Sequence, residues 1–171
     1  MGRARLNTAL RPVSAADLDD IADIFGWYAL HTVTTFEEAP RTLREWEDLR
    51  AMLSNLGLPF LVATVNGRVA GYAYAGPWRA KPAYRHTVED SVFIAPGMTG
   101  RGIGRQLLAE LLSSCADSGT RQVVAVLADT GDLAPTALHR AFGFTDAGRL
   151  RQVGYKHGRW IDTLLMQRSL P

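Results

Sequence analysis

The sequence predicts a single domain of mixed α and β structure, of α/β or α+β class rather than a doubly wound parallel sheet. Two observations lead to this prediction. The hydrophobic period changes between helical and strand-like spacing along the chain, and the order is irregular: strand, two helices, a three-stranded meander, helix, strand, helix and final strands. A chain of 171 residues has about the length of one domain. Because no repeat or linker interrupts it, we expect residues 1–171 to form one domain with an ordered core at about 9–168.

The N-terminal part is expected to form one strand and two helices. Residues 9–13 suit a short strand. Ser14 is a suitable N-cap for a helix over 15–30, where apolar residues recur at helical spacing. The same spacing returns in "TLREWEDLRAML" and predicts a second helix over 42–53.

Three strands follow as a meander. Residues 59–76 consist of two apolar runs joined by Asn66 and Gly67, a pair that strongly favours a two-residue hairpin turn. The third strand is expected in "HTVEDSVFI", residues 86–94.

The C-terminal half alternates between helices and strands. Apolar residues at helical spacing predict a helix over 103–115 that ends near Gly119. The apolar run "RQVVAVLA", 121–128, is typical of a strand buried on both faces. A short helix over 134–142 and a hairpin over 154–170 complete the chain.

The composition is that of an ordinary soluble globular protein, with 47% apolar and 21% charged residues. A net charge of +2 and the lack of basic runs argue against nucleic-acid binding. The segment Met1–Leu10 has no apolar core of a signal peptide, and no run of 18 apolar residues suggests a membrane span. The single cysteine, Cys115, fits a reducing compartment, so we expect a cytoplasmic protein that does not bind membranes.

The segment "TGRGIG", from Thr99 to Gly104, places three glycines directly before a helix. A helix N-terminus offers unpaired N–H groups and a partial positive charge, which suit a phosphate, and glycine lets the backbone approach closely. The Gly-Lys-Ser/Thr of a P-loop is missing, because Arg105 follows Gly104. The spacing of a dinucleotide-binding fingerprint is missing as well. A turn that merely starts a helix remains the alternative.

Together, "SVFI", a proline, "GRGIG" and the amphipathic helix resemble the acyl-CoA-binding motif of the GCN5-related N-acetyltransferases, whose order of elements matches nearly the whole chain. The resemblance implies a central, mixed and mostly antiparallel sheet flanked by helices, with acetyl-CoA as cosubstrate. The family pattern Gln/Arg-x-x-Gly-x-Gly/Ala begins at Thr99, which departs from it. The implied acetyl-CoA contacts are Val92, Phe93 and Ile94, the loop residues Thr99, Gly100, Arg101, Gly102, Ile103, Gly104 and Arg105, and Asp132, where relatives usually have asparagine.

Three segments, "KPAYRHTVEDSVFI", "ALHRAFGF" and "VGYKHGRWIDTLLMQ", look like those of the phosphinothricin acetyltransferase subfamily, which also acetylates methionine sulfoximine. This resemblance implies a small amino-acid-like amine as acceptor, attacked directly in a ternary complex. It also implies a homodimer. No cluster of residues has metal-ligand spacing, and no metal is expected.

The attack of an amine on a thioester benefits from a general base, because the amine is mostly protonated at pH 7. Glu89 lies within an apolar strand, where a carboxylate is costly, and the family places its base there. Asp90 should point to the opposite face of the strand. His139 stands where the subfamily has a histidine near the sulfur, and it titrates in a range suited to proton transfer. A surface glutamate and a packed helix histidine are the structural alternatives.

For the acceptor, Arg79 and Arg85 offer guanidinium groups that pair with carboxylate or phosphinate, and Tyr84 lies beside them in the sequence. Phe36 belongs to a segment that covers the acceptor pocket in the subfamily. Lys156 and His157 are candidates for closing the pocket from the last hairpin or from a partner subunit.

Two other functions stay open. An enzyme that acetylates protein N-termini would need an open groove, whereas "TTFEEAP" and "GPWRAKPAYR" resemble segments that close a pocket. An acyl-CoA sensor without turnover would keep the glycine loop but would need neither Glu89 nor His139.

Overall fold

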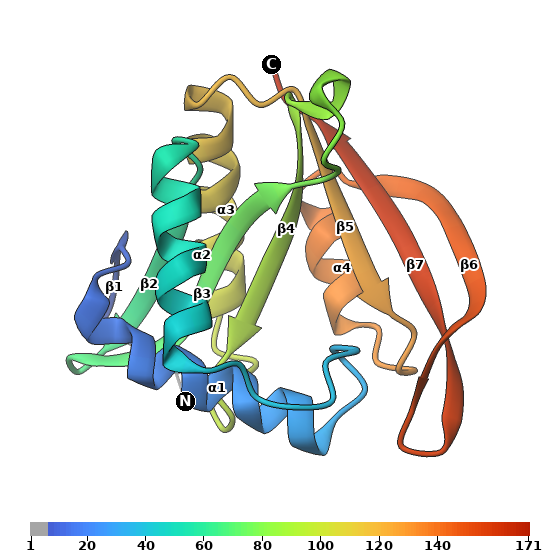
Figure 1. The fold of residues 1–171 in the computed structure, drawn as a ribbon, viewed down its shortest axis with the longest axis horizontal. Coiled ribbons are helices and arrows are strands. Elements are labelled where there is room, and N and C mark those ends of the chain that lie inside the picture. The colour runs from blue at the N-terminus through green and yellow to red at the C-terminus, as the bar shows by residue number, and fades with distance from the viewer. Residues whose placement is uncertain (1–6) are drawn as a thin grey trace, which may run out of the picture.

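The computed structural model describes residues 7–171. Residues 1–6, which belong to the N-terminal segment Met1–Leu10, lie outside it. The chain forms one seven-stranded sheet with helices on both faces (Figure 1). Its elements are β1 (Thr8–Pro12), η1 (Ala15–Asp17), α1 (Leu18–His31), α2 (Leu43–Asn55), β2 (Phe60–Val65), β3 (Arg68–Pro77), η2 (Pro82–Tyr84), β4 (Thr87–Ile94), α3 (Ile103–Asp117), β5 (Gln122–Ala128), α4 (Ala134–Ala141), β6 (Thr145–Lys156) and β7 (Arg159–Ser169).

The strand order is β1-β2-β3-β4-β5-β7-β6, and only the pair β4–β5 is parallel. This confirms the mixed, mostly antiparallel sheet. The hairpin turn predicted between β2 and β3 is also present, with positive φ angles of 52° at Asn66 and 78° at Gly67.

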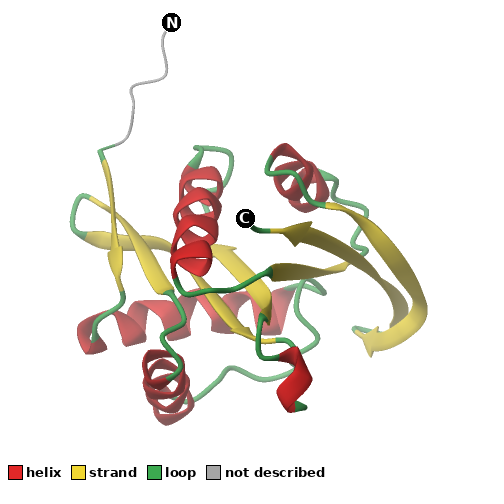
Figure 2. Ribbon diagram, turned by 90° about the horizontal axis from the view of Figure 1, so that it is seen from above, coloured by secondary structure: helices red, strands yellow, loops and turns green. Residues whose placement is uncertain are grey.

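Helices cover both faces of the sheet (Figure 2), and the two faces carry different side chains. Helices α1 and α2 pack on an aromatic layer. Phe25 contacts Phe93 edge to face, and Trp46 contacts Tyr72 in the same way. Phe25 and Trp46 also contact each other edge to face. Helix α3 packs on the other face through leucines, above small residues of β2 and β3. A Cβ added at Gly71 would lie 3.2 Å from Leu107, so the small residue lets α3 approach the sheet closely.

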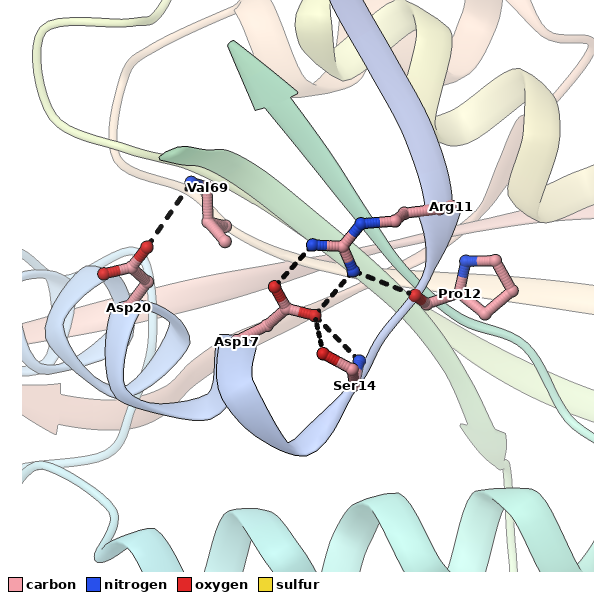
Figure 3. Close-up of polar contacts among 6 residues, drawn as sticks. All are labelled: Arg11, Pro12, Ser14, Asp17, Asp20 and Val69. Carbon is pink, nitrogen blue, oxygen red and sulfur yellow. Dashed lines mark hydrogen bonds and ion pairs between the residues drawn. The ribbon is translucent and has the colours of Figure 1, made fainter. Parts of the chain in front are cut away.

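Polar side chains fix the start of the first helix (Figure 3). Ser14 and Asp17 form a capping box, and Arg11 donates two hydrogen bonds of 2.7 Å to the Asp17 carboxylate. Hydrogen bonds from Arg11 and Ser14 lower the pKa of Asp17 to about 2, although burial of the carboxylate opposes this shift. Helix α2 begins with the same device, in which Glu45 donates its N–H to the Thr42 hydroxyl and accepts from the Thr42 N–H.

Two sequence predictions differ from the structure. Strand β6 begins at Thr145, nine residues before the hairpin expected at 154–170. These nine residues were not predicted as a strand because they are exposed and show no apolar alternation. Strand β5 is not buried on both faces. Val123 and Ala125 are fully buried against α3, whereas Val124 and Val126 are only partly covered, because α1 and α2 lie over β2–β4 and not over β5.

The parallel pair at the centre of the sheet is short. Its register covers Thr87–Glu89 of β4 and Gln122–Val124 of β5, after which the two strands separate toward their C-terminal ends (Figure 1). Strand β4 remains paired with β3 on its other edge as far as Ile94, and β5 with β7 as far as Ala128. The facing edges of β4 and β5 are therefore unpaired with each other directly beyond Glu89.

Candidate active site

The open edge of β4 carries backbone groups that have no strand beside them. Beyond Glu89, no residue of β5 pairs with β4. Successive residues of a strand direct their N–H and C=O groups to alternate edges, so at least one of Val92, Phe93 and Ile94 directs an amide toward the edge that β5 leaves unpaired. The Phe93 side chain packs in the aromatic layer, and those of Val92 and Ile94 pack toward α3, so these residues offer only their backbones at this edge.

The glycine loop leads into α3, whose first turn packs near Ile94 at the end of β4. Gly100 and Gly102 have positive φ angles of 71° and 82°, which only glycine adopts easily. Gly102 occupies the N-cap position and gives the helix no side-chain cap. A Cβ added at Gly102 would meet no protein atom within 4 Å, so the space beside this backbone is open to a ligand. Gly104 instead packs near Ile94 and Leu138, which brings α3 close to β4 and α4.

The remaining loop residues differ in their surroundings. Ile103 is 1% exposed, so it can offer only its backbone to a ligand. Thr99 and Arg101 are exposed. The Arg105 guanidinium lies 5.1 Å from the centre of the Phe142 ring.

Glu89 is half-buried where the strands separate, and its side chain points to the face that carries α1 and α2, the face of Phe93. Burial, followed by the negative charge of Asp90, raises the pKa of Glu89, and the positive charge of Arg79 partly opposes this. No hydrogen bond to the Glu89 carboxylate is present among residues 7–171. A carboxylate with raised proton affinity and unused acceptor capacity is suited to act as a general base.

Asp90 points to the opposite face, as its position in the strand predicts, and forms a buried pair with His139 of α4. The distance from His139 Nε2 to Asp90 Oδ2 is 2.8 Å, and His139 Nδ1 donates to the Pro135 carbonyl at 2.7 Å. Burial alone would lower the pKa of His139, but the hydrogen bond and charge of Asp90 and the Pro135 carbonyl outweigh it, so the pKa is raised. Asp90 Oδ1 is buried without a partner.

The role expected for His139 near the sulfur stays a prediction, and the structure shows what its ring nitrogens contact. The His139 side chain is only 5% exposed, and both of its ring nitrogens are engaged. The residue therefore joins α4 to β4. Sequence reasoning assigned no role to Asp90. Its place beside Glu89 on the opposite face was the available signal.

Asp132 also has a local role. Its Oδ1 accepts a hydrogen bond of 2.9 Å from the Ala134 N–H at the first residue of α4. A carboxylate at a helix N-terminus is favoured by the helix dipole. The aspartate that replaces the usual asparagine is thus used by the helix.

The loop before β4 places its arginines differently. Arg79 lies 4.9 Å from the centre of the Trp78 ring, near enough to Glu89 to act on its pKa. The Arg85 guanidinium folds back and donates to the Pro82 carbonyl at 3.3 Å. Tyr84 lies in η2 and is 43% exposed.

The loop between α1 and α2 lies on the Glu89 face. Phe36 is 40% exposed and rests on Gly154 of β6. Arg41, which sequence reasoning missed, lies 5.0 Å from the Phe25 ring and 5.2 Å from the Trp46 ring. The sequence around Arg41 does not predict these ring contacts, because a single arginine before a helix is usually at the surface.

No metal centre is visible in the part of the chain that the structure describes, since no three His, Cys, Asp or Glu residues there gather suitably. None of the helices at 7–171 is long and apolar enough to cross a membrane. Two open cavities, of about 520 Å³ beside Arg149 and Asp162 and about 430 Å³ beside His31 and His157, do not include Glu89. The candidate site is therefore defined by the strand separation.

Comparison with known proteins identifies the family. Residues 10–165 match the acetyltransferase (GNAT) domain. The chain belongs to the GNAT acetyltransferase family. It is 44% identical to a phosphinothricin N-acetyltransferase of Alcaligenes faecalis over 98% of this chain and 85% of that protein. It is 36% identical to an L-methionine sulfoximine/L-methionine sulfone acetyltransferase of Salmonella typhimurium over 94% of each.

A solved structure agrees with this assignment. The crystal structure of a phosphinothricin acetyltransferase from Sinorhizobium meliloti in complex with AcCoA superimposes with a TM-score of 0.92 at 42% identity, over 96% of this chain and 89% of that one. The present GNAT protein is an acetyl-CoA-dependent N-acetyltransferase. Its uncapped α3 N-terminus, the open space at Gly102 and the unpaired edge of β4 fit this cosubstrate, because they offer backbone donors to phosphate and amide groups.

We expect Gly102→Ala to raise the KM for acetyl-CoA about tenfold, because the new Cβ occupies the space at the helix N-terminus without touching protein atoms. Steady-state kinetics with varied acetyl-CoA measure this. Gly57→Ala is the matched control: Gly57 also has a positive φ, 67°, and an open Cβ position. Equal KM values in the two variants would contradict a phosphate-binding role for Gly102.

Proposed function

We propose that this acetyltransferase moves the acetyl group of acetyl-CoA to the amine of a small amino-acid-like acceptor of the phosphinothricin, methionine sulfoximine or methionine sulfone type. The reaction is a direct attack in a ternary complex. The observation that carries the proposal is the placement of Glu89 at the point where β4 and β5 separate, with a cationic side chain, Arg79, nearby. The names of the two relatives support the acceptor class.

In this proposal Glu89 takes a proton from the acceptor ammonium, directly or through a water molecule. The amine nitrogen then forms a bond to the acetyl carbon, and the bond from that carbon to sulfur breaks. The nitrogen loses a second proton as it becomes an amide, and the departing thiolate takes up this proton and leaves as coenzyme A. An amide of β4 between Val92 and Ile94 would donate to the carbonyl oxygen as its negative charge grows.

His139 acts in this proposal as a positioning residue. Its hydrogen bond to Asp90 fixes α4 against β4, and Asp90 is the residue that follows Glu89 in the strand. Since a carbonyl only accepts hydrogen bonds, Nδ1 carries a proton. The hydrogen bond and the charge of Asp90 raise the pKa of His139 against the effect of burial.

We expect Glu89→Gln to lower kcat/KM for the acceptor about 100-fold, the usual scale of general-base catalysis. Because burial raises the pKa of Glu89, the base form is gained at a higher pH than for an ordinary carboxyl group. Wild-type kcat/KM should therefore rise with pH through this shifted ionisation, and the acidic limb should be absent in Glu89→Gln. Glu110→Gln, on the exposed face of α3, is the matched control. Wild-type activity of Glu89→Gln at pH 7 would contradict the assignment.

For the acceptor we expect methionine sulfoximine or phosphinothricin to be acetylated far faster than a plain alkylamine of equal length. The difference should lie mainly in the acceptor KM, because the head group is bound in ground and transition state alike. Arg79→Ala should reduce this preference more than Arg85→Ala, whose guanidinium is held by Pro82. Thiol release with a panel of amines, including N-terminal peptides, measures it.

Each outcome of the panel separates the candidate functions. A preference for peptides would favour acetylation of protein N-termini. Tight acetyl-CoA binding without thiol release from any amine would favour a sensor. The buried Cys115 does not disturb a thiol assay of the native protein, since burial and the Asp90 charge raise its pKa to about 12.

We further propose a homodimer in the cytoplasm. β6 is an edge strand, and exposed apolar side chains gather on the β6–β7 hairpin: Leu150, Val153, Tyr155 and Trp160. A second copy could pair with this edge across a two-fold axis. The single buried cysteine supports a reducing compartment.

We expect light scattering to give twice the chain mass of 18.7 kDa at micromolar concentration, and Trp160→Arg to shift the mass toward one chain. Trp160 is 62% exposed, so the substitution should leave the fold intact, which circular dichroism checks. A wild-type mass of one chain would contradict the dimer.

A further inference from the structure

Hydrogen bonds at the two ends of β4 show which edge each of its residues faces. The His86 carbonyl, just before the strand, accepts from the Gln122 N–H of β5 at 3.2 Å. The Ala95 N–H, just after the strand, donates to the Ala70 carbonyl of β3 at 2.9 Å. The register of β4 with β3 runs between these ends without a shift. Because successive residues face alternate edges, the even-numbered residues of β4 direct their N–H and C=O groups toward β5 and the odd-numbered ones toward β3.

The unpaired edge beyond Glu89 therefore carries the backbone groups of Val92 and Ile94, whereas those of Phe93 face β3. A ligand along this edge meets N–H donors and C=O acceptors in alternation. A chain that contains amides fits such an edge, because each amide also carries a donor and an acceptor. The arm that links the diphosphate of acetyl-CoA to its thioester is a chain of this kind.

Tyr28 of α1 reaches this edge from the face that carries α1 and α2. Its hydroxyl donates to the Ile94 carbonyl at 2.8 Å, and the two residues are 66 positions apart in the chain. Helix α1 runs past the C-terminal end of β4 (Figure 1). The Tyr28 ring is half-buried and packs edge to face on Phe93, with 5.3 Å between the ring centres. Burial raises the pKa of Tyr28, so the hydroxyl keeps the proton that it donates.

This contact changes what the edge offers to a ligand at Ile94. The Ile94 carbonyl is engaged by Tyr28, while the phenol oxygen, which gives its proton to that carbonyl, keeps its own capacity to accept. A ligand at this level meets the Ile94 N–H as a donor and the Tyr28 oxygen as an acceptor. A side chain of α1 thus supplies a partner where β5 has left the strand.

Ile94 also lies between the two ends of the acetyl-CoA site. A Cβ added at Gly104 would lie 3.7 Å from Ile94 Cδ1, so the start of α3 is beside Ile94. Glu89 lies farther back along the same strand, roughly 17 Å from Ile94 at about 3.3 Å per residue. A ligand with its diphosphate at the N-terminus of α3 and its thioester toward Glu89 must pass the Tyr28 hydroxyl with its amide-bearing arm.

We propose that Tyr28 binds the arm of acetyl-CoA: its phenol oxygen accepts a hydrogen bond from an amide N–H of the arm, while its O–H remains on the Ile94 carbonyl. The inference rests on the proposed function only in directing the thioester toward Glu89, and it does not depend on which amine is the acceptor.

Tyr28→Phe tests the role of the hydroxyl, because it keeps the ring on Phe93. Isothermal titration with coenzyme A, without any acceptor, should give a Kd about fivefold above that of the wild type, which corresponds to the loss of one hydrogen bond. The nucleotide end alone, 3′-phospho-ADP, should bind both proteins within twofold. Tyr72→Phe is the matched control: Tyr72 stacks on the same Phe93 ring, and its buried hydroxyl has no hydrogen-bond partner among residues 7–171.

Two results of this titration would overturn the proposal. An unchanged or lower Kd for coenzyme A in Tyr28→Phe would mean that the freed Ile94 carbonyl serves the ligand at least as well. An equal loss of affinity for coenzyme A and 3′-phospho-ADP would mean that the substitution acts on the start of α3 and not on the arm. Both readouts are independent of turnover, so a failure of the proposed acceptor class leaves them intact.

Analogues of coenzyme A give a second test, which begins with the wild-type protein. Replacing each amide of the arm in turn by an ester removes one N–H donor from the ligand. One of the analogues should bind the wild type about fivefold more weakly than coenzyme A, and the same analogue should lose less than twofold further affinity in Tyr28→Phe. Wild-type affinities equal to that of coenzyme A, or losses that add fully to the Tyr28→Phe loss for every analogue, would assign the N–H groups of the arm to other acceptors and refute the role of Tyr28.

Discussion

The active site depends on one constraint, the short parallel pairing of β4 and β5. Two strands that stay paired use all of their facing N–H and C=O groups on each other. Here the pairing ends at Glu89 and Val124, although both strands continue. The unpaired edge of β4 then offers backbone donors to a ligand, the start of α3 stands at the open end, and Glu89 stands at the closed end. Each feature of the proposed acetyl-transfer site is placed by this separation.

The separation is held open by contacts on both faces of the sheet. On one face His139 and Asp90 join α4 to β4. Removing one partner would leave a buried charge unpaired, which is strongly destabilising. On the other face the loop between α1 and α2 reaches from β6 to the side of β3. Neighbouring residues of β4 therefore serve different ends: Asp90 secures the fold, and Glu89 remains available for chemistry.

Charge is distributed in accordance with this division. The carboxylate that is proposed to act as a base has no hydrogen bond within residues 7–171, and its pKa is raised by burial and by Asp90. By contrast, the structural carboxylate of Asp17 has a donor on each of its oxygens. Asp17 accepts from Arg11 and Ser14, and its pKa is lowered to about 2. The contrast distinguishes a poised group from a structural one by its partners rather than by its residue type.

The sequence by itself determined the elements whose cause is local. Helical spacing predicted α1 to α4, the Asn66-Gly67 turn predicted the first hairpin, and strand parity placed Glu89 and Asp90 on opposite faces. Resemblance of the glycine loop to the family's motif led to acetyl-CoA. Only the tertiary structure decided that His139 is buried against Asp90, that Asp132 is used by α4, that β6 begins at Thr145, and that Lys156, Gly154 and Arg41 attach the loop between α1 and α2. These features are formed by residues up to about 120 positions apart. Their free energy comes from burial and from partners on other elements, and no period or spacing within one segment records either.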